Sequence, residues 1–192
     1  HRDIYVSRNY LNDAKLNDKV VVGDIQWTSA LLNPEGKIVE VLGKSGSGEV
    51  EISVIAKEFN LPLKFSPEVE NEAASTPGTI TETDIKNRID LRDKNIFTID
   101  PADAKDFDDA VSVEKTENGN FLVGIHIADV SHYVKQNSAL DKEAEKRGNS
   151  VYLVGKVIPM LPEKLSNNIC SLVPNEDRLT YSVLVELTSR GK

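Results

Sequence analysis

The 192-residue sequence contains one Cys, and only 39% of its residues are hydrophobic. A single cysteine excludes an internal disulfide and is typical of a reducing compartment, so we expect a cytoplasmic protein. No apolar run approaches the roughly 20 residues of a membrane-spanning helix, and the N-terminus lacks the charged and apolar regions of a signal peptide. These absences predict a protein without a membrane partner.

Positive charge is also scarce, because 23 Lys and Arg stand against 31 Asp and Glu, for a formal net charge of −8. This balance alone speaks against a nucleic-acid-binding surface, because phosphate contacts require Lys and Arg. The acids are concentrated in residues 67–85 and 98–111, however, and the remainder is close to balanced. The total therefore says little against a polyanionic substrate, although the main surface that grips one should lie elsewhere.

Residues 1–62 read as short strands joined by turns. The segments rich in β-branched residues are 4–6, 19–25, 36–42 and 50–56, separated by glycine-rich or Asn-Pro turns. Four short antiparallel strands without a long helix predict part of a small barrel or sandwich. Trp27 and Tyr5 could offer stacking faces to RNA, but we expect both to pack in the barrel core. The start at His1, without a methionine, predicts an excised piece of a longer protein.

Residues 63–87 change character, with three prolines or glycines, five acids and few large apolar side chains. They are predicted to be an acidic linker, with a short helix at 81–87 that is capped by Thr81 or Thr83. Residues 88–192 read as α+β. The turn at Asn118-Gly119 predicts a hairpin of strands 110–114 and 121–128. A capping pattern at Ser138 predicts a helix that ends before Gly148. Further strands are expected at 96–99, 151–154 and 181–187, and a helical turn at 162–167.

The most informative stretch is residues 98–111, Thr-Ile-Asp-Pro-Ala-Asp-Ala-Lys-Asp-Phe-Asp-Asp-Ala-Val, in which five carboxylates fall within ten residues. Crowded carboxylates raise one another's pKa, and a divalent cation relieves that cost. Carboxylate oxygens are ligands that Mg²⁺ prefers. We therefore predict that the acids that follow one strand and begin the next hold one or two Mg²⁺ for phosphoryl transfer, with Phe107 anchoring the loop. They are Asp100, Asp106, Asp108 and Asp109.

The alternative interpretation of this stretch is a solvated acidic turn, which rarely has apolar segments on both sides. An EF-hand is excluded, because it requires alternating acids and a glycine at the sixth position. A phosphatase motif is excluded as well, because Asp106-Phe107-Asp108 is followed by Asp109-Ala110 rather than Gly-Thr.

Four stretches together resemble the RNB-domain exoribonucleases of the ribonuclease II and ribonuclease R family, with the closer match to ribonuclease R. They are 98–111, Ile-His-Ile-Ala-Asp-Val-Ser at 125–131, Arg-Gly-Asn-Ser-Val-Tyr-Leu at 147–153, and Ile-Pro-Met-Leu-Pro at 158–162 running on to Cys-Ser-Leu at 170–172. The segment Gly-Lys-Ile-Val-Glu-Val-Leu at 36–42 resembles the end of that family's second cold-shock domain. The resemblance implies a partial OB-like barrel (1–62), a linker (63–87) and the N-terminal part of an α+β RNB catalytic domain (88–192).

The resemblance also implies an activity, namely processive 3′→5′ hydrolysis of RNA to nucleoside 5′-monophosphates with Mg²⁺. The family's catalytic aspartates fall on Asp100, Asp106, Asp108 and Asp109, and its base-packing tyrosine falls on Tyr152. Stacking on an aromatic face is tolerant of sequence, which suits an enzyme that degrades any single-stranded 3′ end. Asp103 receives no catalytic role. The parent protein is expected to be a monomer.

An RNB domain is roughly twice as long as the segment after Arg88, so this chain lacks the family's catalytic arginine and is expected to hydrolyse little or no RNA by itself. Two other functions stay open: a non-catalytic RNA-binding OB-type module, and an unrelated carboxylate nuclease acting on DNA. Of the remaining residues, His126 and His132 lack the spacing of a zinc site, and Cys170 is expected to be packed. Arg147 is equally compatible with a phosphate contact and with the C-terminal end of its helix.

Overall fold

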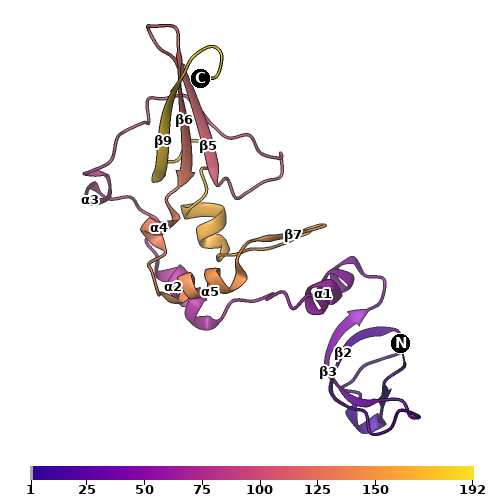
Figure 1. The fold of residues 1–192 in the computed structure, drawn as a ribbon. Helices are drawn as coiled ribbons and strands as arrows, with labels where there is room; N and C mark the ends of the chain where they lie inside the picture. Colours follow the sequence, from indigo (N-terminus) through magenta and orange to yellow (C-terminus); the bar gives the residue numbers. More distant parts are fainter. Residues whose placement is uncertain (1) are drawn as a thin grey trace. The chain divides into compact units, whose positions relative to one another are not determined.

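The computed structural model describes residues 2–192, which form two compact units (Figure 1). The first unit comprises the chain up to Leu63 together with Tyr152–Ile158, and the second comprises Lys64–Val151 and Pro159–Lys192. Both contain helices and strands, so the predicted α+β class is confirmed. In the described part of the chain no helix is both long and apolar enough to pass through a membrane.

The first unit is built on a three-stranded sheet in the order β1-β3-β2, with β1 at Tyr5–Val6, β2 at Asp18–Gln26 and β3 at Glu35–Lys44. β2 and β3 pair antiparallel, with register shifts along their length. β1 pairs with β3 in parallel, so the expectation of antiparallel strands throughout was wrong. The short helix η1 at Arg8–Tyr10 follows β1, at the start of the connection to β2.

The strand predicted at residues 50–56 is instead the helix α1, Gly48–Glu58. The β-branched residues of this segment suggested a strand. Charge favours the helix, because Glu49 and Glu51 lie in its first turn and Lys57 in its last, as the helix dipole requires. Ala56 is fully buried, and Asn60 adopts positive φ just after the helix ends.

The second unit contains a four-stranded antiparallel sheet in the order β4-β5-β6-β9. Its strands are β4 at Ile96–Phe97, β5 at Asp109–Lys115, β6 at Phe121–Ala128 and β9 at Thr180–Leu187. The predicted hairpin is confirmed, and Gly119 has the positive φ of 85° that its turn requires. Figure 1 shows β5, β6 and β9 side by side, with α4 (Val130–Tyr133) directly after β6.

His126 ties three strands of this sheet together on the buried face. Its ring is only 1% exposed. Nε2 lies 3.0 Å from the Ser112 hydroxyl on β5, and Nδ1 lies 2.9 Å from the Ser182 hydroxyl on β9. Gly124 leaves room for this bridge, because a Cβ there would lie 2.4 Å from Ser112 Oγ and 2.6 Å from His126 Nε2.

Residues 67–75, predicted as part of an extended linker, form the helix α2 (Pro67–Ser75). Ser66 caps it and proline occupies its first turn, a start signal that the acid-rich composition obscured. Val69 and Ala73 are buried, and α2 packs beside α5 (Ala139–Arg147) (Figure 1). Part of the predicted linker therefore contributes a helix to the core of the second unit.

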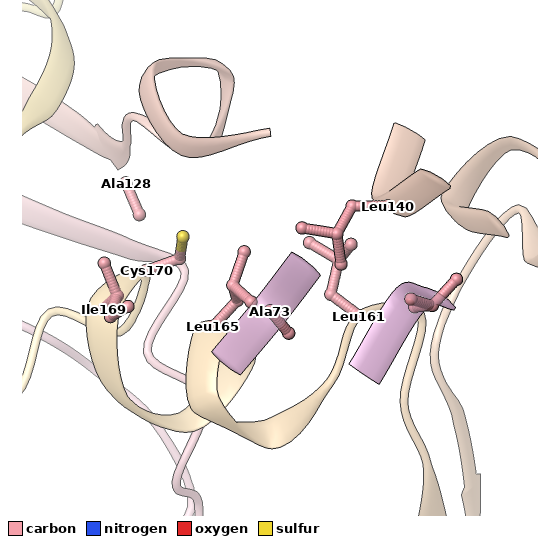
Figure 2. Close-up of a cluster of buried hydrophobic side chains, with 8 residues drawn as sticks. Ala73, Ala128, Leu140, Leu161, Leu165, Ile169 and Cys170 are labelled. Atoms are coloured by element: carbon pink, nitrogen blue, oxygen red, sulfur yellow. The ribbon is translucent and has the colours of Figure 1, made fainter. Parts of the chain in front are cut away.

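That core gathers side chains from α2, the end of β6, α5 and the segment 161–170 (Figure 2). Its buried members are Val69, Ala73, Ala128, Leu140, Leu161, Leu165, Ile169 and Cys170. The turn predicted at 162–167 winds more widely than expected, as the π-helix η2 at Leu165–Ile169. Of the two residues predicted as the cap of the helix α3 (Glu82–Ile85), Thr81 is the one that caps it, and α5 has its predicted cap at Ser138. β7 (Val151–Leu153) and β8 (Lys156–Ile158) form a separate two-stranded sheet.

Candidate active site

The acidic loop, defined here as residues 98–109, connects β4 to β5. β4 ends at Phe97, two residues earlier than predicted, so Asp100 lies in the loop rather than at the strand end. Asp109 is the first residue of β5 and pairs with Ile127 on β6. The loop therefore connects two strands, as the sequence predicted, and the structure adds that these strands are neighbours in one sheet.

Backbone hydrogen bonds hold the second half of the loop on two sides. The Ala128 N–H donates to the Asp108 carbonyl at 3.0 Å, which extends the pairing of β5 with β6. The Leu172 N–H donates to the Phe107 carbonyl at 2.9 Å. The Phe107 side chain is half-buried, in line with its expected role as an anchor. Asp106 and Asp108 therefore project from a backbone that is fixed between them.

A third contact comes from Ser171, which sequence reasoning missed. Its hydroxyl accepts the Phe107 N–H at 2.9 Å and donates to the Lys105 carbonyl at 2.8 Å. The side chain is fully buried. The only signal in the sequence was its place in the stretch Cys170-Ser171-Leu172, because a partner more than 60 residues away leaves no periodic pattern.

The charges of three of the aspartates act on the fourth, Asp108. Loss of water around the carboxyl raises the pKa of Asp108, and the charges of Asp106, Asp109 and Asp100 raise it further, in that order. The loop thus concentrates negative charge at one point. Its field reaches the core as well, since burial first and the Asp108 charge second raise the pKa of the Cys170 thiol to about 12.

The chemistry of this donor set fits a hard divalent cation. Every candidate ligand is a carboxylate oxygen, and a cation would relieve the repulsion that raises the pKa of Asp108. Among residues 2–192, no three His, Cys, Asp or Glu side chains converge closely enough to hold a metal ion as they stand. Binding of Mg²⁺ by Asp100, Asp106, Asp108 and Asp109 therefore stays a prediction.

Tyr152 lies in the middle of β7, and its side chain is 62% exposed. It belongs to the first unit, whereas the acidic loop belongs to the second. An exposed ring on a short strand has the surface that base stacking requires. Its role toward a nucleotide stays a prediction.

Three other candidates have structural roles. His126 is the buried bridge between strands, and burial lowers its pKa. Arg147 stacks over the Phe65 ring at 3.7 Å and donates to Glu143 and to the carbonyls of Pro159 and Lys64. Its side chain is only 3% exposed, which leaves little surface for a phosphate. Cys170 is buried, as expected, and its raised pKa makes it a poor nucleophile.

The expectation that Trp27 and Tyr5 pack in a core was wrong. Trp27 is 59% exposed and Tyr5 57% exposed, and nearby Tyr10 is 48% exposed. The Arg2 guanidinium lies 5.6 Å from the centre of the Trp27 ring, and Lys37 Nζ lies 4.9 Å from that of Tyr10. The small sheet of the first unit is too short to cover these rings, so aromatic and basic groups share its surface.

Comparison with known protein families gives two matches that follow each other along the chain. The family described as RNB domain matches residues 88–192, and the family described as cold shock domain matches residues 1–66. The chain is 51% identical over 192 residues to ribonuclease R of Thermotoga maritima, an alignment that covers 99% of this chain and 27% of that protein. The chain thus spans about a quarter of the length of this relative.

Two solved structures are also similar. Mycoplasma genitalium RNase R in complex with ribose methylated single-stranded RNA has a TM-score of 0.90 at 31% identity, over 100% of this chain and 30% of that chain. Yeast Ssd1, a pseudonuclease, has a TM-score of 0.69 at 25% identity, over 97% of this chain and 24% of that chain. The partial cold-shock and RNB architecture expected from the sequence is therefore confirmed.

Proposed function

Because this chain belongs to the RNB-domain family, we propose that its acidic loop is part of the active site of an exoribonuclease of the ribonuclease R kind. The proposed reaction is processive hydrolysis of single-stranded RNA from the 3′ end to nucleoside 5′-monophosphates. The observation that carries the proposal is the placement of Asp100, Asp106, Asp108 and Asp109 on one loop between β4 and β5, within the segment that matches the RNB domain. That arrangement costs stability unless a cation compensates it.

Mg²⁺ is the proposed cofactor, held by Asp100, Asp106, Asp108 and Asp109. When bound, such a cation polarises a phosphate and lowers the pKa of an attacking water. The chain's own contribution is to fix the backbone that carries Asp106 and Asp108, while the carboxylates themselves still have to converge on the cation. Asp108 and Phe107 are tied to β6 and to Leu172 by their carbonyls, so little backbone freedom has to be lost on binding.

The substrate proposal follows from two features. The related Mycoplasma genitalium enzyme is seen in complex with ribose methylated single-stranded RNA. In this chain the exposed ring of Tyr152 is proposed to stack on the terminal base, which requires no particular base identity. The 192 residues span about a quarter of the related ribonuclease R, so we expect them to bind metal weakly and to release few or no nucleotides alone.

Crystals of the chain soaked in Mn²⁺ test the metal site. Anomalous scattering should place an ion beside Asp100 and Asp108. Density beside the acids of α2 instead, or none near the acidic loop at millimolar Mn²⁺, would refute this proposal. Single-stranded RNA and DNA offered side by side to the intact protein separate a ribonuclease from a carboxylate nuclease acting on DNA.

A second candidate function is RNA binding without hydrolysis. The exposed aromatic and basic groups of the first unit favour it, and Ssd1 shows that a pseudonuclease has a similar fold. Trp27 is the only tryptophan in the chain, so its fluorescence reports binding to this surface directly. Quenching by an RNA oligonucleotide, unchanged in Asp108→Asn, would show that RNA binding is independent of the acidic loop. Turnover by the intact protein that disappears with Asp108→Asn would favour the nuclease.

A further inference from the structure

Ser171 is the one side chain among those described here whose hydroxyl joins two backbone groups of the acidic loop. Its Oγ donates to the carbonyl of Lys105 at 2.8 Å and accepts the N–H of Phe107 at 2.9 Å. These two groups lie on either side of Asp106 along the chain. The contact therefore fixes the backbone on both sides of the proposed ligand Asp106, and with it the backbone that leads to the next proposed ligand, Asp108.

Ser171 is itself rigidly held. Its N–H donates to the Asn168 carbonyl at 3.0 Å, and its own carbonyl accepts the Arg178 Nε–H at 2.9 Å. The Arg178 Nε–H lies 3.1 Å from the Asn168 carbonyl as well, so one guanidinium spans the end of η2. The Ser171 side chain has no exposed surface, so no water competes for its hydroxyl.

The neighbouring contacts do not replace this hydroxyl. Leu172 and Ala128 fix the carbonyls of Phe107 and Asp108 through main-chain N–H groups, which substitution leaves in place. Without the hydroxyl of Ser171, the Phe107 N–H and the Lys105 carbonyl lose this partner in a partly buried setting. These two backbone groups then turn toward other partners or toward water, and the Asp106 carboxylate between them moves with the backbone.

We propose that Ser171 is a positioning residue for the acidic loop, which sets the spacing of the Asp106 and Asp108 carboxylates toward a divalent cation. This inference rests on the proposed function, since it assumes that the loop binds such a cation. Groups that orient metal ligands without touching the metal change its affinity by about 10–100-fold when they are removed. Ser171 acts on the ligands through the backbone, so the lower end of that range, about tenfold, is expected.

The test measures Mn²⁺ binding to the 192-residue chain by electron paramagnetic resonance, in which free Mn²⁺ gives the signal that binding removes. Ser171→Ala removes the hydroxyl, and Ser171→Cys keeps nearly the same volume with a much weaker hydrogen-bonding group. Both should weaken Mn²⁺ binding by about tenfold. Hydrogen exchange at the Phe107 amide should accelerate in both.

Ser112→Ala is the matched control, because Ser112 is also buried and hydrogen-bonded but its partner is His126. It should destabilise the same unit and leave the Mn²⁺ affinity unchanged. Wild-type affinity in the two Ser171 variants, or an equal loss in Ser112→Ala, would overturn the role of Ser171 and leave the proposed function standing. A wild-type chain that binds no Mn²⁺ would overturn the proposed function and this inference with it.

Discussion

Replacing Gly124 by alanine should destabilise the second unit, because the buried bridge of His126 occupies the space that a side chain at position 124 would need. The new Cβ would lie 2.4 Å from Ser112 Oγ, 2.6 Å from His126 Nε2 and 2.8 Å from His126 Cε1. Contacts below 3.0 Å require movement of at least one partner. Both partners are buried and joined to each other, so neither can move without breaking their hydrogen bond.

The magnitude follows from two costs and one gain. Overpacking costs about 1–3 kcal/mol, and loss of the hydrogen bond between Ser112 and His126 costs about 0.5–1.5 kcal/mol. Alanine restricts the unfolded chain relative to glycine, which returns about 0.4–1 kcal/mol. The free energy of unfolding should therefore fall by roughly 0.5–4 kcal/mol.

Urea unfolding followed by far-ultraviolet circular dichroism measures this loss. Trp27 lies in the first unit, so its fluorescence serves as an internal control that should keep its midpoint. Gly78→Ala is the matched substitution, because its new Cβ would meet Ile169 Cγ1 at an ordinary 3.7 Å and should cost nothing. If Gly124→Ala unfolds at the same urea concentration as Gly78→Ala, the account of the His126 bridge is refuted.

Three further predictions concern buried groups of the second unit. Burial lowers the pKa of His126, so the unfolded chain binds more protons than the folded chain as pH falls below about 6.5. The stability that the neutral ring contributes should therefore decrease as pH drops below that value. The urea midpoint should depend less on pH in His126→Gln than in the wild type. Burial raises the pKa of Cys170 to about 12, so its reaction with a thiol reagent at pH 8 should be slow in the native chain and fast in urea, and rapid native labelling would contradict the packing of Figure 2. Burial alone would raise the pKa of Asp129, but hydrogen bonds from Arg88 at 2.6 Å and from Ser131 hold this pKa below its ordinary value. Asp129→Ala should lower the melting temperature more than Arg88→Ala, because it removes both these hydrogen bonds and the cap of α4.

Local sequence signals predicted most elements of the second unit. The Asn118-Gly119 turn, the Ser138 cap and the closing Gly148 each act over a few residues, and the structure contains all three. The helix α1 was missed because its β-branched residues were given more weight than its terminal charges. The helix α2 was missed because its acidic composition concealed Val69 and Ala73, whose partners come from distant segments.

For the candidate site, too, the sequence showed the local pattern but not the contacts made by distant segments. The crowding of aspartates is visible in the sequence, and the structure adds that Asp108 responds to three other carboxylates. The Ser171 contact that orients the loop could not be read from the sequence, because Ser171 reaches it across a sequence separation that no local pattern reveals. The exposure of Trp27 also depends on how little sheet surrounds it, which is a property of the folded unit.

The most direct test of the proposed cation site compares Asp108→Asn with Asp103→Asn in the same chain. Both substitutions remove one charge from the acidic loop, but Asp103 has no assigned role. Isothermal titration with Mn²⁺ should show binding to the wild type and to Asp103→Asn and a loss of at least tenfold in affinity for Asp108→Asn, with all three chains folded. Equal affinities for the two variants would contradict a cation site centred on Asp108.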